Sequence, residues 1–161
     1  MNADGSNVVW VCHALTANSD VADWWTGLIG TDKAIDPARH FIVCANILGS
    51  CYGSSGPHTI NPETGKPWYR SFPAITIRDM VQAHVLLRKH LQIPHIHLLI
   101  GGSMGGYQVL EWALTEPGIA DRLFLLCTGA AESAWGIAIH TAQRLAIEAD
   151  DTWQDECHSA G

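Results

Sequence analysis

Basic side chains are scarce in this sequence of 161 residues, where 9 Lys and Arg face 16 Asp and Glu and the formal net charge is -7. This balance argues against a general nucleic-acid binder, because phosphate contacts need clustered Lys or Arg. Long apolar runs are also missing, since no stretch of about 18 apolar residues occurs. The first six residues do not resemble a signal peptide. We therefore expect neither nucleic acid nor a membrane as a partner.

Paired cysteine motifs are absent as well. None of the five cysteines forms a CxxC pair, and three of them lie inside apolar runs, with Cys12 and Cys127 expected in the core. That pattern favours free thiols in a reducing cytoplasm over a disulfide framework or a metal site. His95 and His97 are spaced to share one face of a strand, but no third ligand is evident, so we expect no metal. The five are Cys12, Cys44, Cys51, Cys127 and Cys157.

Four short apolar runs predict the strands of a parallel sheet. Each is rich in Val, Ile, Leu or Phe without polar alternation, as expected for strands buried on both faces. The length and a composition of 47% hydrophobic and 16% charged residues are typical of one globular domain. Strands alternating with helical patterns predict a doubly wound α/β fold with right-handed crossovers. The expected strands cover 8–12, 41–47, 95–100 and 123–127, and the helices 77–91, 105–116 and 131–149.

A long connection over residues 49–73 interrupts this alternation. It holds four glycines and four prolines, and a connection of that length inside a compact domain is usually functional when it is ordered. A disordered insertion is the alternative, but Trp68, Tyr69 and Phe72 argue against it.

The strongest chemical signal is a glycine-rich turn around Ser103. The sequence Gly-Gly-Ser-Met-Gly-Gly over residues 101–106 follows an apolar strand and opens a helix, which is the context of a nucleophile elbow. Glycines are needed there because the serine sits on a sharp, strained turn against a neighbouring strand. A phosphate-binding turn is the alternative, but no Walker lysine follows. Ser103 is therefore the candidate nucleophile.

A nucleophilic serine needs a histidine and an acid, which follow it in the chain when it lies on such an elbow. Downstream of Ser103 the histidines are His140, which lies in a helical pattern and is expected to be structural, and His158, which lies near the chain end. A triad of Ser103 with Asp150 or Asp151 and His158 is one alternative. We expect instead that the acid and the base are missing.

Oxyanion-hole donors are easier to place. One is the backbone N–H after the nucleophile, that of Met104, and the other comes from a loop after an earlier strand. The apolar run 8–12 leads into residues 13–16, which are well placed to supply the second N–H.

Several further stretches together resemble the homoserine O-acetyltransferase family of α/β-hydrolase-fold acyltransferases. The resemblance implies acetyl transfer from acetyl-CoA to the hydroxyl of L-homoserine in methionine biosynthesis, by a ping-pong route through an acyl-serine. It implies no permanently bound cofactor, with acetyl-CoA as co-substrate, and a homodimer for the full-length enzyme. The stretches are residues 12–16, 24–25, 28–30, 46–57, 61–67, 72–73, 76–81, 101–106 and 110–113.

By position, the resemblance makes Ser103 the acylated nucleophile and gives Leu15 and Met104 the oxyanion N–H groups. It implies that residues 49–73 wall a substrate tunnel. Arg78 then either faces the site or is a surface charge near a helix start. Trp24 and Trp25 either line the substrate mouth or pack a helix onto the sheet.

The resemblance also divides the chain. Residues 1–130 correspond to the central part of an α/β-hydrolase core, and residues 131–161 to the start of a helical lid. Family members have strands before the first strand here, and later strands that carry the catalytic Asp and His. The chain therefore resembles a fragment of the enzyme that does not turn over alone. The alternatives are a serine hydrolase or esterase, a homoserine or serine O-succinyltransferase, and a catalytically inactive interaction module.

Overall fold

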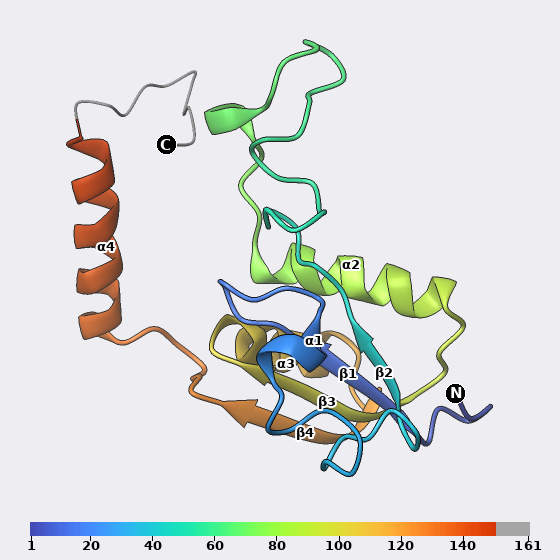
Figure 1. Ribbon diagram of the computed structural model, residues 1–161. Coiled ribbons are helices and arrows are strands. Elements are labelled where there is room, and N and C mark those ends of the chain that lie inside the picture. The colour runs from blue at the N-terminus through green and yellow to red at the C-terminus, as the bar shows by residue number, and fades with distance from the viewer. Residues whose placement is uncertain (151–161) are drawn as a thin grey trace.

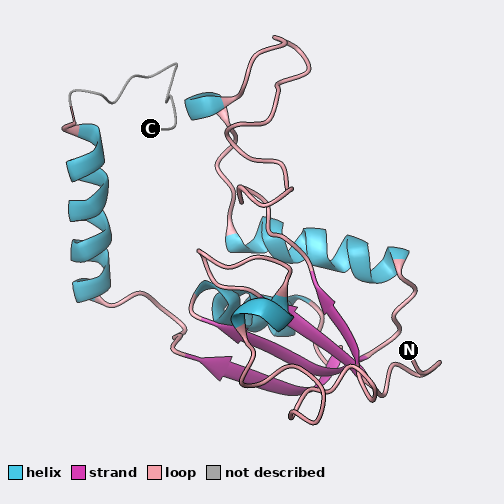
Figure 2. Cartoon of the chain, viewed as in Figure 1, coloured by secondary structure: helices cyan, strands magenta, loops and turns pink. Residues whose placement is uncertain are grey.

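The computed structural model describes residues 1–150 and shows a four-stranded parallel sheet at the centre of the molecule (Figures 1 and 2). The strand order is β2-β1-β3-β4, and every neighbouring pair is parallel. Because β1 lies between β2 and β3, Val11 is paired with Cys44 on one side and with Ile100 on the other. The strands are β1 (Val8–Cys12), β2 (Phe41–Cys44), β3 (Ile96–Gly102) and β4 (Ala120–Leu126).

Helices cover both faces of the sheet, as the doubly wound pattern predicts. Alternate side chains of β1 point to opposite faces. On one face Trp10 packs with side chains of α2 and α3, and on the other Val11 packs with α1 and the segment after it. Right-handed crossovers place successive helices on the sheet in this way. The helices are α1 (Val21–Trp24), α2 (Ile77–His90), α3 (Met104–Thr115), α4 (Ala134–Glu148) and a 3-10 turn at Tyr69–Ser71.

Helix α2 is fixed at both ends. At its start Thr76 and Asp79 form a capping box, in which the Asp79 backbone N–H donates to Thr76 Oγ1 and the Thr76 N–H donates to the carboxylate. The Thr76 hydroxyl also donates to the Asp79 carboxylate, and this hydrogen bond, with that from the Thr76 N–H, lowers the pKa of Asp79. At its end Arg88 donates to the Ile93 carbonyl and, over 2.9 Å, to Glu116 after α3. The carboxyl-terminal ends of helices α2 and α3 are thus joined, at the end of α3 away from Ser103.

Strand β4 departs from the sequence prediction. An apolar strand buried on both faces was expected there, but Leu123 and Phe124 are 42% and 47% exposed. In residues 1–150, β4 is an edge strand of the sheet. A run of apolar residues in the sequence does not show whether other segments cover the strand, so the exposure of β4 could not be predicted from it. Cys127, expected in the core, is exposed because it lies just beyond this strand.

Two segments extend away from the sheet. Residues 49–73 project beyond α2, and α4 stands apart from the body (Figure 1). The first segment is nevertheless held by its own backbone, because the Asn61 N–H donates to the Lys66 carbonyl and the Trp68 N–H to the Thr59 carbonyl. No residue of α4 is buried. The division of the chain at residue 130 stays a prediction.

No helix within residues 1–150 is long and apolar enough to cross a membrane.

The cysteines differ in their exposure to solvent. Cys12 is buried and Cys44 is half-buried, and burial raises the pKa of the Cys44 thiol to about 12. Cys51 is exposed, and all four cysteines of the described part of the chain are free thiols. Cys157 lies outside the described residues.

Candidate active site

Ser103 occupies a strained turn between β3 and α3. Its backbone φ is 53° and its ψ is -122°, in a region that non-glycine residues rarely adopt. The Ser103 N–H donates to the Leu126 carbonyl at the end of β4, over 2.9 Å, which fixes the turn on the sheet. The side chain is exposed and does not cap α3. Its hydroxyl is therefore presented outward at the carboxyl end of the strands.

Two glycines make this turn sterically feasible. A Cβ atom on Gly101 would overlap the carbonyl of Gly105, and a Cβ atom on Gly105 would overlap the carbonyl of Cys12 at the end of β1. Both overlaps are with backbone, which does not move aside as a flexible side chain does. The glycine requirement read from the sequence thus has a direct steric cause.

Leu15 and Met104 meet at one cavity of about 400 Å³. Met104 is the first residue of α3, so its N–H is among the unpaired donors at the positive end of the helix dipole. Leu15 lies in the loop after β1, with a side chain that is 71% exposed. The structure therefore brings the two residues that the sequence assigns to the oxyanion hole to the lining of one cavity. Their catalytic roles stay predictions.

The remaining wall of this cavity is uncharged. Both ends of the segment 49–73 contribute to it, whereas the middle of that segment projects away from the site (Figure 1). Small, apolar and thiol groups predominate, which suits an uncharged acyl group better than an ionised one. The other lining residues are Ile47, Leu48, Gly49, Ser50, Cys51, Pro57, Phe72, Pro73, Ile75 and Met80.

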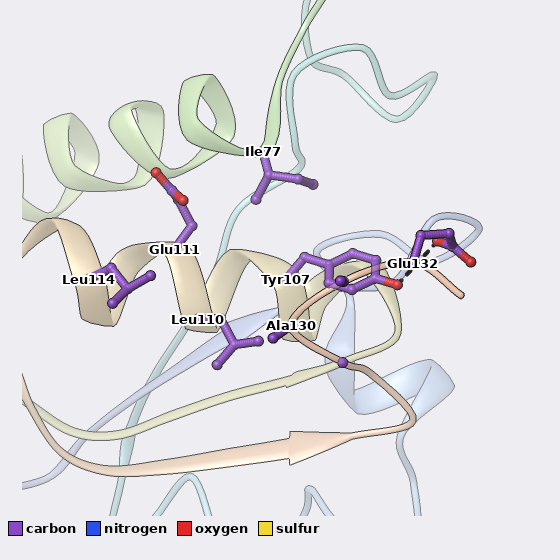
Figure 3. A pocket seen from close by; sticks show the side chains of 9 residues that line it. Ile77, Tyr107, Leu110, Glu111, Leu114, Ala130 and Glu132 are labelled. Atoms are coloured by element: carbon purple, nitrogen blue, oxygen red, sulfur yellow. Dashed lines mark hydrogen bonds between the residues drawn. The ribbon is translucent and has the colours of Figure 1, made fainter. Parts of the chain in front are cut away.

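A second cavity of about 420 Å³ lies between α3, the start of α2 and the connection from β4 to α4 (Figure 3). Leu110 and Leu114 point into it, and the Tyr107 hydroxyl donates to Glu132 at its rim over 3.4 Å. Neither Ser103 nor Met104 lines it. Although this cavity is slightly larger, we assign the candidate site to the first cavity, because Met104, the residue directly after the strained Ser103, lines the first cavity and not the second. Ser103 itself lines neither cavity.

A strand, a strained serine turn and a helix in this order form the nucleophile elbow of a known fold. A family model described as alpha/beta hydrolase fold matches residues 7–157. The chain belongs to this family.

Relatives within the family share both sequence and structure with the chain. Homoserine O-acetyltransferase from Trichormus variabilis is 53% identical over 154 residues, which are 96% of this chain and 43% of that protein. The structure of homoserine O-acetyltransferase from Bacillus anthracis superimposes with a TM-score of 0.84 at 29% identity, covering 96% of this chain and 46% of that one. Esterase E22 superimposes with a TM-score of 0.85 at 30% identity and the same coverage. The chain spans less than half the length of these relatives.

In the described part of the chain, no candidate acid or base is hydrogen-bonded to the Ser103 hydroxyl. His140 is exposed on α4, where its Nδ1 lies 4.0 Å from Glu132 Oε1. Asp150 is exposed just beyond the same helix. Among residues 1–150 no hydrogen bond joins the Ser103 hydroxyl to a histidine. Asp151 and His158, the other members of the alternative triad, lie outside the described residues.

Arg78 is a surface charge. Its Nε lies 2.6 Å from Glu111 Oε1, its side chain is 73% exposed, and the carboxylate raises the pKa of the guanidinium. Trp24 and Trp25 stack on each other at 5.0 Å and pack against the sheet. None of the three residues lines the cavity beside Ser103.

His95 and His97 are engaged by a carboxylate. The Asp121 oxygens lie 2.8 Å from His95 Nε2 and 3.4 Å from His97 Nδ1, and these contacts lower the pKa of Asp121. Residues 1–150 contain no cluster of three His, Cys, Asp or Glu side chains arranged for a metal ion.

Sequence reasoning missed a buried polar network below the site. His84 and Gln108 are both buried, and His84 Nε2 lies 2.9 Å from Gln108 Oε1. Each occupies an apolar position of its helix, on the side that packs against β1. A polar side chain within an apolar helical face was the available signal, because a buried polar group is costly unless it is hydrogen-bonded.

Proposed function

We propose that this chain carries the nucleophile and the oxyanion hole of a homoserine O-acetyltransferase, in which Ser103 takes an acetyl group from acetyl-CoA and passes it to the hydroxyl of L-homoserine. The observation that carries the proposal is the strained Ser103 turn beside the cavity shared by Leu15 and Met104. The 53% identity to a homoserine O-acetyltransferase supports the choice of acetyl and homoserine.

The reaction has two balanced halves. First, Ser103 Oγ attacks the thioester carbonyl of acetyl-CoA, the C–S bond breaks, and the serine proton leaves with the CoA thiol. Second, the homoserine hydroxyl attacks the acetyl-serine, and its proton returns to Ser103 as the ester bond to the enzyme breaks. Both halves require a general base that takes and returns this proton. The proposal therefore requires a histidine and an acid from outside residues 1–150.

The oxyanion formed in each half has its stabilising groups in this chain. Leu15 and Met104, whose N–H groups are the proposed donors, both line the cavity beside the Ser103 turn, and the amino end of α3 adds a positive dipole end. Loss of one such donor costs about 2.7–4 kcal/mol in comparable enzymes. The apolar lining of the cavity favours burial of the acetyl group, and exclusion of water from the complete site would keep water from competing with homoserine.

The cofactor, pathway, location and assembly expected from the family resemblance are part of the same proposal. Acetyl-CoA is a co-substrate and no cofactor is permanently bound. The pathway is methionine biosynthesis in the cytoplasm, and the full-length enzyme is a homodimer. The names of the relatives support the reaction, whereas pathway, location and assembly rest on the family resemblance alone.

An esterase is the second candidate function. Esterase E22 superimposes on this chain as well as the acetyltransferase structure does, with TM-scores of 0.85 and 0.84. An acyl-serine hydrolysed by water instead of homoserine would give this activity from the same Ser103 site. The acceptor therefore discriminates between the two functions.

The test replaces the matching segment of the Trichormus variabilis relative by residues 1–150 of this chain, so that the rest of that protein completes the enzyme. We expect the chimera to release CoA from acetyl-CoA in the presence of L-homoserine, and the same chimera with Ser103→Ala to be inactive. A folded chimera that releases CoA equally fast without homoserine would favour the esterase. A folded chimera with no release in either case would contradict the acetyltransferase, and one that also fails to hydrolyse 4-nitrophenyl acetate would contradict the esterase.

A further inference from the structure

Two oxyanion donors must converge on one point, although here they lie on different elements. Leu15 belongs to the loop after β1, and Met104 begins α3. A displacement of about 1 Å at such a site can cost about 100-fold in rate. Something must therefore hold the loop against the helix.

The Gln108 side chain makes this connection. It is fully buried on the second turn of α3, and its Nε2 donates to two carbonyls, each over 3.3 Å. One is the carbonyl of His13, two residues before Leu15, and the other is the carbonyl of Met104. A single carboxamide thus spans the loop and the helix start that carry the two donors.

His13 extends the connection to a third element. Its Nδ1 lies 2.8 Å from the Ala14 carbonyl and its Nε2 lies 3.2 Å from the Ile47 nitrogen. A carbonyl only accepts and an amide N–H only donates, so the ring is neutral with its proton on Nδ1. Ile47 lines the candidate cavity. The His13 ring therefore ties the loop that carries Leu15 to a second segment that lines the same cavity.

The two carbonyl oxygens determine which way the Gln108 amide points, and His84 supplies the donor for the amide oxygen. A flipped amide would place Oε1 against two carbonyl oxygens, so Nε2 faces them and Oε1 accepts from His84 Nε2. The imidazole is stacked on Trp112 at 5.6 Å and lies edge-on to Trp10 at 5.8 Å. Burial in this aromatic setting lowers the pKa of His84, which keeps the ring neutral.

We propose that Gln108 is a positioning residue that sets the relative placement of the Leu15 and Met104 N–H groups, and that His84 holds the Gln108 amide in place by donating to its Oε1. Neither side chain lines the candidate cavity, so both act through the backbone they hold. An apolar side chain at position 108 would be buried at lower cost, and it would leave the His13 and Met104 carbonyls without this donor. This inference depends on the proposed function in one respect, which is that the Leu15 and Met104 N–H groups form an oxyanion hole.

The test measures backbone order in the native 161-residue chain by NMR relaxation. Gln108→Met keeps the length of the side chain and removes its hydrogen bonds. We expect the order parameter of the Leu15 amide to fall from about 0.85 to about 0.6, with the amides of β1 unchanged. Gln82→Met, the same exchange at an exposed position of α2, should leave Leu15 unchanged.

Two variants of His84 separate positioning from general stability. His84→Leu removes the donor to Gln108 Oε1 and should reproduce the loss of backbone order at Leu15. If Gln108→Met does not fold, this variant tests the positioning role in its place. His84→Gln can still donate and should restore order. Unchanged order at Leu15 and Met104 in both Gln108→Met and His84→Leu would overturn the proposal. An inactive chimera would contradict the proposed function and leave this result unaffected.

Discussion

The carbonyl oxygen of Cys12 occupies the position where a side chain on Gly105 would begin. The end of β1 and the start of α3 are therefore in direct backbone contact, and this contact brings the loop that carries Leu15 to the turn that carries Ser103. The candidate site exists because these two elements approach so closely.

Gly105→Ala should destabilise the fold, since its methyl group would force β1 and α3 apart. We expect a loss of about 1–3 kcal/mol in the free energy of unfolding, measured by urea denaturation. The control is Gly27→Ala, where a Cβ atom meets nothing within 4 Å. A Gly105→Ala protein as stable as Gly27→Ala would show that the contact is not tight in solution.

Ser103→Gly should stabilise the fold relative to Ser103→Ala. Both variants remove the hydroxyl, but only glycine relieves a backbone held at φ 53°. We expect a difference of about 1 kcal/mol in the free energy of unfolding. Equal stabilities would mean that the turn stores no strain.

Acid should weaken the contact between β3 and β4. His95 and His97 lower the pKa of Asp121 below its ordinary value of 3.8, so the stabilisation is present above that value and is lost as pH falls through the lower, folded-state pKa. Asp121→Asn should therefore lower stability at pH 6 and lose its effect under strongly acid conditions. Denaturant titrations across this range measure the difference. A destabilisation by Asp121→Asn that is independent of pH would contradict this ion-pair role. Asp23→Asn, at an exposed position of α1, is the control.

Alkylation should distinguish the cysteines. Burial raises the pKa of the Cys44 thiol to about 12 and also raises that of Cys12, whereas Cys51 and Cys127 are exposed. Because the thiolate is the reactive form, iodoacetamide at pH 8 should modify Cys51 and Cys127 first. Peptide mapping by mass spectrometry follows each site. Equal rates at all four would show that Cys12 and Cys44 are accessible.

Much of this arrangement was predictable from local sequence. The run 8–12 matches β1 at both ends, and the elbow at Ser103 was evident from its glycines and their place between a strand and a helix. The burial of β4 was predicted incorrectly, because covering of a strand depends on distant segments and not on its own residues. The partnership of His84 with Gln108 was also missed, since the two residues belong to different helices and only tertiary packing brings them together.

Acetylation of Ser103 can be observed by trapping the acetyl group on the enzyme. The chimera described above is mixed with acetyl-CoA without homoserine, quenched in acid and digested, and its peptides are mapped by mass spectrometry. The account predicts one acetyl group on Ser103, which disappears when homoserine is added before the quench. An active chimera acetylated at another residue, or at none, would contradict it.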